Sequence, residues 1–144
     1  MPVKPKFIIK EYVDKHVHPQ DLALFEEVWK WIHTDKGITD FFFDGGTRTP
    51  DGIQGLAYLF HDLKYYFGGS QDDRRIADDD LQMMMKNRDA PVWSWVIRNV
   101  LRFAQFAFRR TNRRFFKRDD GKTWRTEIPE SLLRKSRSPL KKEK

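Results

Sequence analysis

The sequence predicts a mainly α-helical fold with minor β-structure, in which compact antiparallel helices form one domain. Three observations support this fold class. Apolar residues recur at three- and four-residue steps in several windows, which is the spacing of one helix face. Glycine and proline interrupt these windows, so the helices are short and turn back on one another. Aromatic residues make up 15% of the 144 residues, which is typical of a chain with a packed interior.

Length and charge divide the chain into a body and a basic end. A chain of 144 residues fits one domain, which we place at residues 1–130. Residues 131–144 are rich in charge and poor in apolar side chains, which predicts a basic, flexible tail. Residues 97–144 carry 16 Lys+Arg and five Asp+Glu, a net charge of +11, whereas the remainder carries 12 and 16, a net charge of −4. This asymmetry indicates an anionic partner for the C-terminal third.

The N-terminal part of the sequence predicts one helix between two extended segments. Residues 6–13 (KFIIKEYV) are β-branched and aromatic, which predicts a short strand. Residues 20–33 place apolar side chains on one helical face, which predicts an amphipathic helix that ends at Gly37. Residues 38–43 (ITDFFF) predict a buried strand or extended segment, and residues 44–52 a loop rich in turn residues.

Two helices joined by a tight turn follow. Residues 53–67 share an apolar helical face, and Gly68 and Gly69 end this helix. Ser70 and the acidic residues after it predict the start of another helix, which ends near residues 89–91. The glycine pair should return the second helix antiparallel to the first.

The C-terminal third begins with a predicted basic amphipathic helix over residues 92–116. Its polar positions recur at three- and four-residue steps and form one stripe along the helix. The arginines expected to bind an anionic partner are Arg98, Arg102, Arg109, Arg113 and Arg114. Residues 119–121 predict a turn, and residues 123–128 a short strand or a loop.

The composition excludes several classes of site. The chain has no Cys, which excludes disulfide frameworks, Cys-ligated zinc, iron–sulfur clusters and thiol nucleophiles. It has no window of about 18 consecutive apolar residues, so we expect no transmembrane segment. The first residues lack the apolar core of a signal peptide, so we do not expect secretion by that route.

Three segments carry residues that can combine into a hydrolytic site. His61 and Tyr65 are four residues apart and therefore share one face of their predicted helix. An Asp on the facing helix would accept hydrogen bonds from both, and would orient the histidine as a general base toward water. Asp62 points about 100° away from His61 and would bind a hard cation together with carbonyl groups of the glycine-rich loop at residues 44–50.

The same residues also suit a purely structural interpretation. In that interpretation Asp78 only caps or orients His61, and the loop only links two elements. The acidic run at residues 77–80 would then be a solvated helix face. The remaining histidines, His16, His18 and His33, are interpreted as surface or loop residues.

The runs FDGGTRTP, LFHDLKY and RRIADDDLQMMM resemble a small domain family of phages and prophages that has no established function. Its members carry T-D-x-x-S-x-P, H-D-x-L-Y and A-D-x-x-F-x-x-x-M. The resemblance covers about residues 38–110, although the loop here is one residue longer, and Thr47 or Thr49 takes the place of the family's Ser. It implies a phage-encoded protein, located in the virion or the host cytoplasm.

The same order of motifs is similar, more distantly, to the calcium-dependent His–Asp phospholipases, whose viral members lack cysteine. This resemblance implies that His61 is the base for water, that Asp78 holds His61 and that Tyr65 supports Asp78. It also implies a bound Ca²⁺. The implied calcium ligands are Asp62 and the loop residues Asp44, Gly45 and Gly46.

Three functions follow from these patterns. The first is a phage protein of the virion or the lysis–entry apparatus with a phospholipase-like site, whose basic helix docks on an anionic membrane surface. The alternative is a non-catalytic tail or head–tail component, whose basic helix binds an acidic virion protein or DNA. A nucleic-acid binder acting through its basic face alone ranks last, because no known nucleic-acid motif is present.

Overall fold

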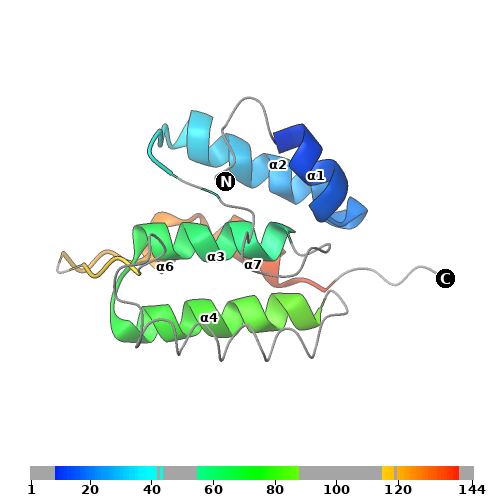
Figure 1. Ribbon diagram of the computed structural model, residues 1–144. Coiled ribbons are helices and arrows are strands. Elements are labelled where there is room, and N and C mark those ends of the chain that lie inside the picture. Colours follow the sequence, from blue (N-terminus) through cyan, green and yellow to red (C-terminus); the bar gives the residue numbers. More distant parts are fainter. Residues whose placement is uncertain (1–8, 42, 44–54, 88–114, 119, 140–144) are drawn as a thin grey trace.

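The fold is mainly helical, as predicted (Figure 1). The computed structural model describes residues 9–41, 43, 55–87, 115–118 and 120–139. Within these residues β-structure consists of isolated bridges, such as the parallel bridge between Gly69 and Lys117. The helical elements in chain order are α1 (Ile9–His16), the 3₁₀ turn η1 (Pro19–Asp21), α2 (Leu22–Lys30), the π-helical turn η2 (Trp31–Asp35), α3 (Gly55–Phe67), α4 (Gln71–Lys86), α6 (Trp124–Glu127) and α7 (Glu130–Arg137).

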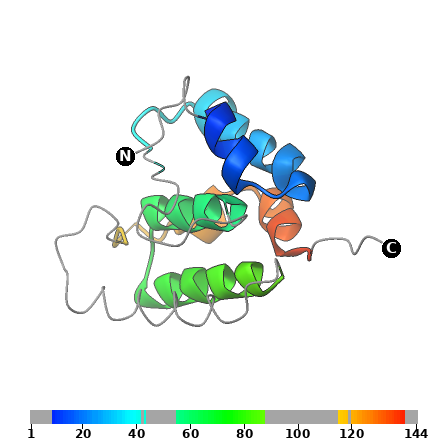
Figure 2. The same cartoon turned by 45° about the vertical axis from the view of Figure 1, so that its right-hand side comes forward.

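Helix α3 is the centre of the described structure. It packs against α2, α4, α6 and α7, and both views place it between α2 and α4 (Figures 1 and 2). Every α3 residue except Asp62 and Tyr66 is buried. Because buried polar groups are almost always hydrogen-bonded, the polar side chains of α3 require partners on the surrounding helices.

The turn between α3 and α4 admits only glycine at its first position. Gly68 has a φ of +74°, and a Cβ atom there would lie 1.7 Å from the carbonyl oxygen of Phe116. Helix α4 then begins with a capping box, in which the Ser70 hydroxyl accepts from the Asp73 amide and the Asp73 carboxylate accepts from the Ser70 amide. The predicted tight turn and the antiparallel return of α4 are both confirmed (Figure 1).

The prediction of a strand at residues 6–13 is wrong over residues 9–13, which belong to α1. A single strand is not stable without a partner, whereas a helix satisfies its own backbone groups. The Val17 amide donates to the Val13 carbonyl, and both side chains are buried at this four-residue spacing. The predicted helix at residues 20–33 is confirmed as η1, α2 and η2, and residues 38–41 lie outside regular helix and strand.

The segment at residues 123–128 contains a helix rather than a strand or a simple loop. Thr123 caps α6, because its hydroxyl accepts from the Arg125 amide while its own amide donates to the Thr126 hydroxyl. Trp124, the first residue of α6, is completely buried.

The first half of the expected flexible tail, residues 131–137, is a packed helix. Residues 131–137 belong to α7, which contacts α2, α3 and α4. Leu132, Leu133 and Ser136 recur at the spacing of one helix face and are buried, while Arg134 and Lys135 are exposed. The average composition of residues 131–144 does not show this periodicity, which is why it predicts a flexible tail. The folded body therefore continues to at least residue 137.

Most of the predicted basic helix, residues 92–114, lies outside the described residues, and so do its five arginines. Only its last two positions, residues 115 and 116, are described. There Phe115 and Phe116 are not helical, because the Phe116 backbone bonds to Tyr65 and Gly69 instead. Among the helices that the structure describes, none combines the length and apolarity needed to cross a membrane.

Replacement of Leu133 by Ala should lower the free energy of unfolding by about 2–5 kcal/mol, because the side chain is 1% exposed and its loss leaves a cavity between α7 and the body. Urea denaturation followed by circular dichroism measures this change. Ser131→Ala is the matched control, since Ser131 is exposed on the same helix. Equal stability of the two variants would show that α7 does not contribute to the folded body.

Candidate functional site

Three residues predicted as catalytic meet between α3 and α4. Asp78 on α4 places its Oδ1 atom 2.8 Å from Nε2 of His61 and 2.6 Å from the hydroxyl of Tyr65. The rings of His61 and Tyr65 lie on one face of α3, with centroids 4.3 Å apart. Asp78 is 1% exposed, so this cluster is enclosed by the two helices.

The cluster determines which histidine nitrogen can act as a base. Tyr65 donates to Asp78, and an ionised carboxylate only accepts hydrogen bonds, so His61 donates through Nε2–H. The neutral imidazole then has its lone pair on Nδ1, on the opposite side of the ring from Asp78. Nδ1 is the atom that can take a proton from water.

The surroundings also keep Tyr65 in its neutral form. Burial raises the pKa of the Tyr65 phenol well above its ordinary value, and the neighbouring Asp78 carboxylate raises it further. Arg74 opposes this shift. Tyr65 is therefore a hydrogen-bond donor to Asp78 over the whole physiological pH range.

The expected calcium ligands are only partly within the described structure. Asp62 is half-buried on α3, directly after His61. Asp44, Gly45 and Gly46 lie outside the described residues, as do the five arginines expected to bind an anionic partner. Among the described residues, no group of three His, Asp or Glu side chains converges as a metal site would require. Calcium binding stays a prediction from the sequence.

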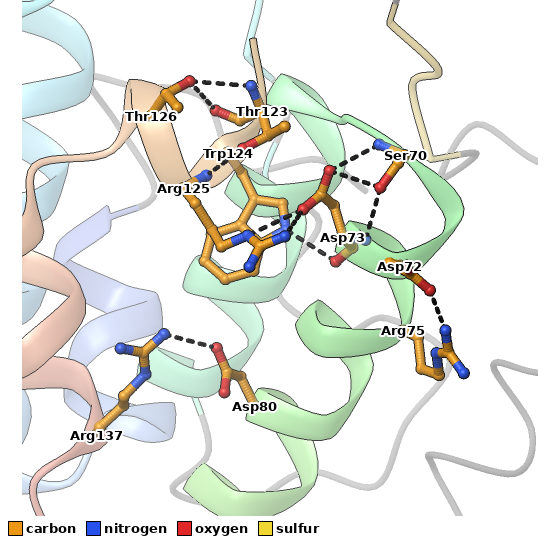
Figure 3. Close-up of polar contacts among 10 residues, drawn as sticks. All are labelled: Ser70, Asp72, Asp73, Arg75, Asp80, Thr123, Trp124, Arg125, Thr126 and Arg137. Atoms are coloured by element: carbon orange, nitrogen blue, oxygen red, sulfur yellow. Dashed lines mark hydrogen bonds and ion pairs between the residues drawn. The ribbon is translucent and has the colours of Figure 1, made fainter. Parts of the chain in front are cut away.

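A second buried charge cluster lies on the neighbouring side of α3. Lys64 is 1% exposed, and its Nζ atom lies 2.9 Å from Oδ2 of Asp80 and 4.7 Å from the ring centroid of Trp124. Arg137 on α7 donates to the same Asp80 oxygen at 3.3 Å (Figure 3). Burial lowers the pKa of Lys64, although Asp80 counteracts part of this shift.

A third cluster joins α6 to the start of α4. Arg125 donates to Oδ1 of Asp73, while the indole of Trp124 donates to the Asp73 carbonyl at 2.9 Å (Figure 3). Burial alone would raise the pKa of the Asp73 carboxyl, but hydrogen bonds from Ser70 and Arg125 outweigh it and hold that pKa below its ordinary value.

The sequence interpretation found the His61 cluster and missed the other two. The acidic run at residues 77–80 is not a solvated face, because Asp78 and Asp80 are both buried. The signal for the second cluster was Lys64 on the apolar face of the helix predicted at residues 53–67, since a lysine on such a face requires a buried acidic partner. Arg74, one turn before Asp78, was not assigned a role either.

The other histidines have local structural roles or an intermediate exposure. His18 accepts from the Gln20 amide at 3.0 Å and so caps η1. The Nδ1 atom of His33 lies 3.0 Å from the carbonyl oxygen of Trp29, one turn earlier.

Comparisons of the chain with protein-family models, with curated proteins and with solved structures gave no match. The resemblances to the phage domain family and to the phospholipases therefore rest on the motifs quoted above.

The second cluster allows a prediction of unequal mutational effects. Asp80→Leu should cost about 3–5 kcal/mol of stability, because it leaves the Lys64 ammonium group buried without its carboxylate. Lys64→Met should cost less, because Asp80 keeps Arg137. The double variant Lys64→Met/Asp80→Leu should be more stable than Asp80→Leu alone. Urea denaturation of the three variants measures these differences.

Asp72→Asn serves as the control for that series. Asp72 pairs with Arg75 on the exposed side of α4, so its loss should change stability by less than about 1 kcal/mol. Strictly additive effects of the two buried substitutions would contradict the coupling of Lys64 and Asp80.

Proposed function

We propose that the protein hydrolyses an ester in the manner of the His–Asp phospholipases, as a phage-encoded component of the virion or of the lysis–entry apparatus. One observation carries the catalytic part of this proposal. The buried Asp78 carboxylate accepts hydrogen bonds from both His61 Nε2 and the Tyr65 hydroxyl, which is the arrangement that prepares a histidine to act as a base.

In the proposed reaction Nδ1 of His61 removes a proton from water while the water oxygen attacks the ester carbonyl carbon. The resulting imidazolium is stabilised by the Asp78 carboxylate, 2.8 Å from Nε2. The tetrahedral intermediate then collapses, the bond to the leaving alcohol breaks, and His61 returns its proton to that alcohol. Tyr65 holds Asp78 in place and transfers no proton.

Two further components of the proposal come from the sequence. A calcium ion held by Asp62 and the loop residues 44–46 would stabilise the negative charge that develops on the ester carbonyl oxygen. The arginines of residues 92–116 would bind an anionic membrane surface, whose phospholipids supply the ester. The steps assigned to His61 and Asp78 do not depend on either component.

His61→Gln should reduce ester hydrolysis by at least about a hundredfold, because glutamine can still donate a hydrogen bond to Asp78 but cannot accept a proton at neutral pH. The assay measures fatty-acid release from vesicles of anionic phospholipid, with calcium and with a chelator. Tyr65→Phe should reduce the rate to a smaller extent. Tyr66→Phe is the matched control, because the Tyr66 hydroxyl instead donates to Asp40, at 2.5 Å.

The assays with calcium and with a chelator test the metal, and the His61 variant tests the base. Loss of activity in the chelator supports the metal, whereas equal rates with and without calcium count against it. If folded wild type and His61→Gln release fatty acid at the same rate, His61 is not the base of such a reaction.

The alternative function is a non-catalytic tail or head–tail component that binds an acidic partner or DNA. The observation that favours it is the burial of the whole cluster, with His61 only 7% exposed, which suits a rigid scaffold.

Phage origin is tested on particles rather than on the isolated protein. Mass spectrometry of purified virions should find the chain at a fixed copy number relative to the major capsid protein, whether the site is active or structural. Its absence from virions of a phage that encodes it would contradict a structural role and leave only the lysis apparatus.

A further inference from the structure

The second oxygen of Asp78 has a different neighbour from the first. Both His61 and Tyr65 bond to Oδ1, whereas Oδ2 lies 3.5 Å from Nη1 of Arg74. Arg74 precedes Asp78 by four residues, so the two side chains share one face of α4. Both oxygens of the Asp78 carboxylate therefore have a polar partner.

Because the Asp78 carboxylate is buried, the positive charge of Arg74 beside it is stabilising. A carboxylate that is 1% exposed is ionised at a high cost in free energy unless a cation or several donors compensate it. Within the described residues the groups facing Asp78 from α3 are His61 and Tyr65, and in the base-competent state of the site both are neutral donors. Arg74 contributes the permanent positive charge, because guanidinium does not lose its proton in proteins.

The guanidinium of Arg74 is itself held in place. Its Nε–H donates to Oε1 of Gln71 at 2.9 Å, one turn earlier on α4. The Arg74 side chain is 21% exposed, so it closes the cluster at the border with solvent. Gln71, Arg74 and Asp78 thus form a continuous row along one face of α4, which ends at His61.

We propose that Arg74 is a positioning residue of this site, which holds the Asp78 carboxylate through Oδ2 so that its Oδ1 atom is directed at His61. Arg74 acts through Asp78 and does not contact the reacting atoms. Its catalytic consequence rests on the proposed hydrolytic function, whereas its effect on the Asp78–His61 hydrogen bond does not.

The test compares Arg74→Met, Arg74→Gln and Arg74→Lys. Arg75→Met is the matched control, because Arg75 is the adjacent arginine and pairs with the exposed Asp72. Nitrogen-15 NMR of the imidazole reports which nitrogen of His61 carries the proton, and the His61 signals are assigned by their loss in His61→Gln. This measurement requires no substrate.

In the wild type and in Arg75→Met, we expect His61 to be protonated at Nε2, with a strongly hydrogen-bonded Nε2–H proton. In Arg74→Met and Arg74→Gln this proton should move upfield and exchange faster with solvent, and Arg74→Lys should restore it in part. If the vesicle assay detects hydrolysis, kcat should fall about tenfold to a hundredfold in Arg74→Met with little change in KM.

The outcomes separate the two proposals. A changed His61 signal without hydrolysis in any variant supports the positioning role and contradicts the hydrolase. Identical His61 signals in the wild type and in a folded Arg74→Gln variant overturn the positioning role, whatever the activity. If Arg74→Met does not fold, Arg74→Gln and Arg74→Lys provide the same comparison.

Discussion

The burial of α3 on every side except that of Asp62 and Tyr66 is the constraint on which the rest of the structure depends. A helix enclosed in this way is usually apolar all round, yet α3 carries His61, Lys64 and Tyr65. Each polar group needs an internal partner, because an unpaired buried group is costly. Helix α4 supplies both partners, Asp78 and Asp80, which lie about 200° apart around its axis and so reach two sides of the contact. Polar pairing therefore selects the register between α3 and α4, in addition to hydrophobic packing.

The ion pairs made by the C-terminal helices change the interpretation of the uneven charge distribution along the sequence. Several cations of the basic C-terminal third pair with acidic residues of the body and so connect α6 and α7 to α2 and α4. The pairs are Arg125 with Asp73, Lys135 with Glu27, and Arg137 with Asp80. Part of the +11 charge of residues 97–144 thus neutralises the acidic body. The net charge of a segment is not the charge that it offers to a partner.

The contacts of the site that the sequence predicts are those that depend on residue spacing within one helix and on the length of the turn after it. The four-residue spacing of His61 and Tyr65 and the two-glycine turn predict that both meet an Asp of the next helix. The resemblance to the phospholipases implies that this residue is Asp78, and the structure has both contacts. The pairing of Lys64 was missed because the acidic run offers several carboxylates, and the one that faces inward depends on the register between helices. The β-propensity of residues 6–13 predicts a strand, but residues 9–16 form α1, because a helix satisfies its own backbone groups without a partner strand.

Two of the buried carboxylates of α4, Asp78 and Asp80, differ in the groups that bind them. Asp80 is bound by two cations, Lys64 and Arg137. Asp78 has one cation at its border, and its closest contacts are Tyr65 and an imidazole, whose second nitrogen can accept a proton. A carboxylate bound only by cations can only neutralise charge. One that orients an imidazole can also stabilise a positive charge on that imidazole, so Asp78 is the carboxylate that the proposed reaction uses.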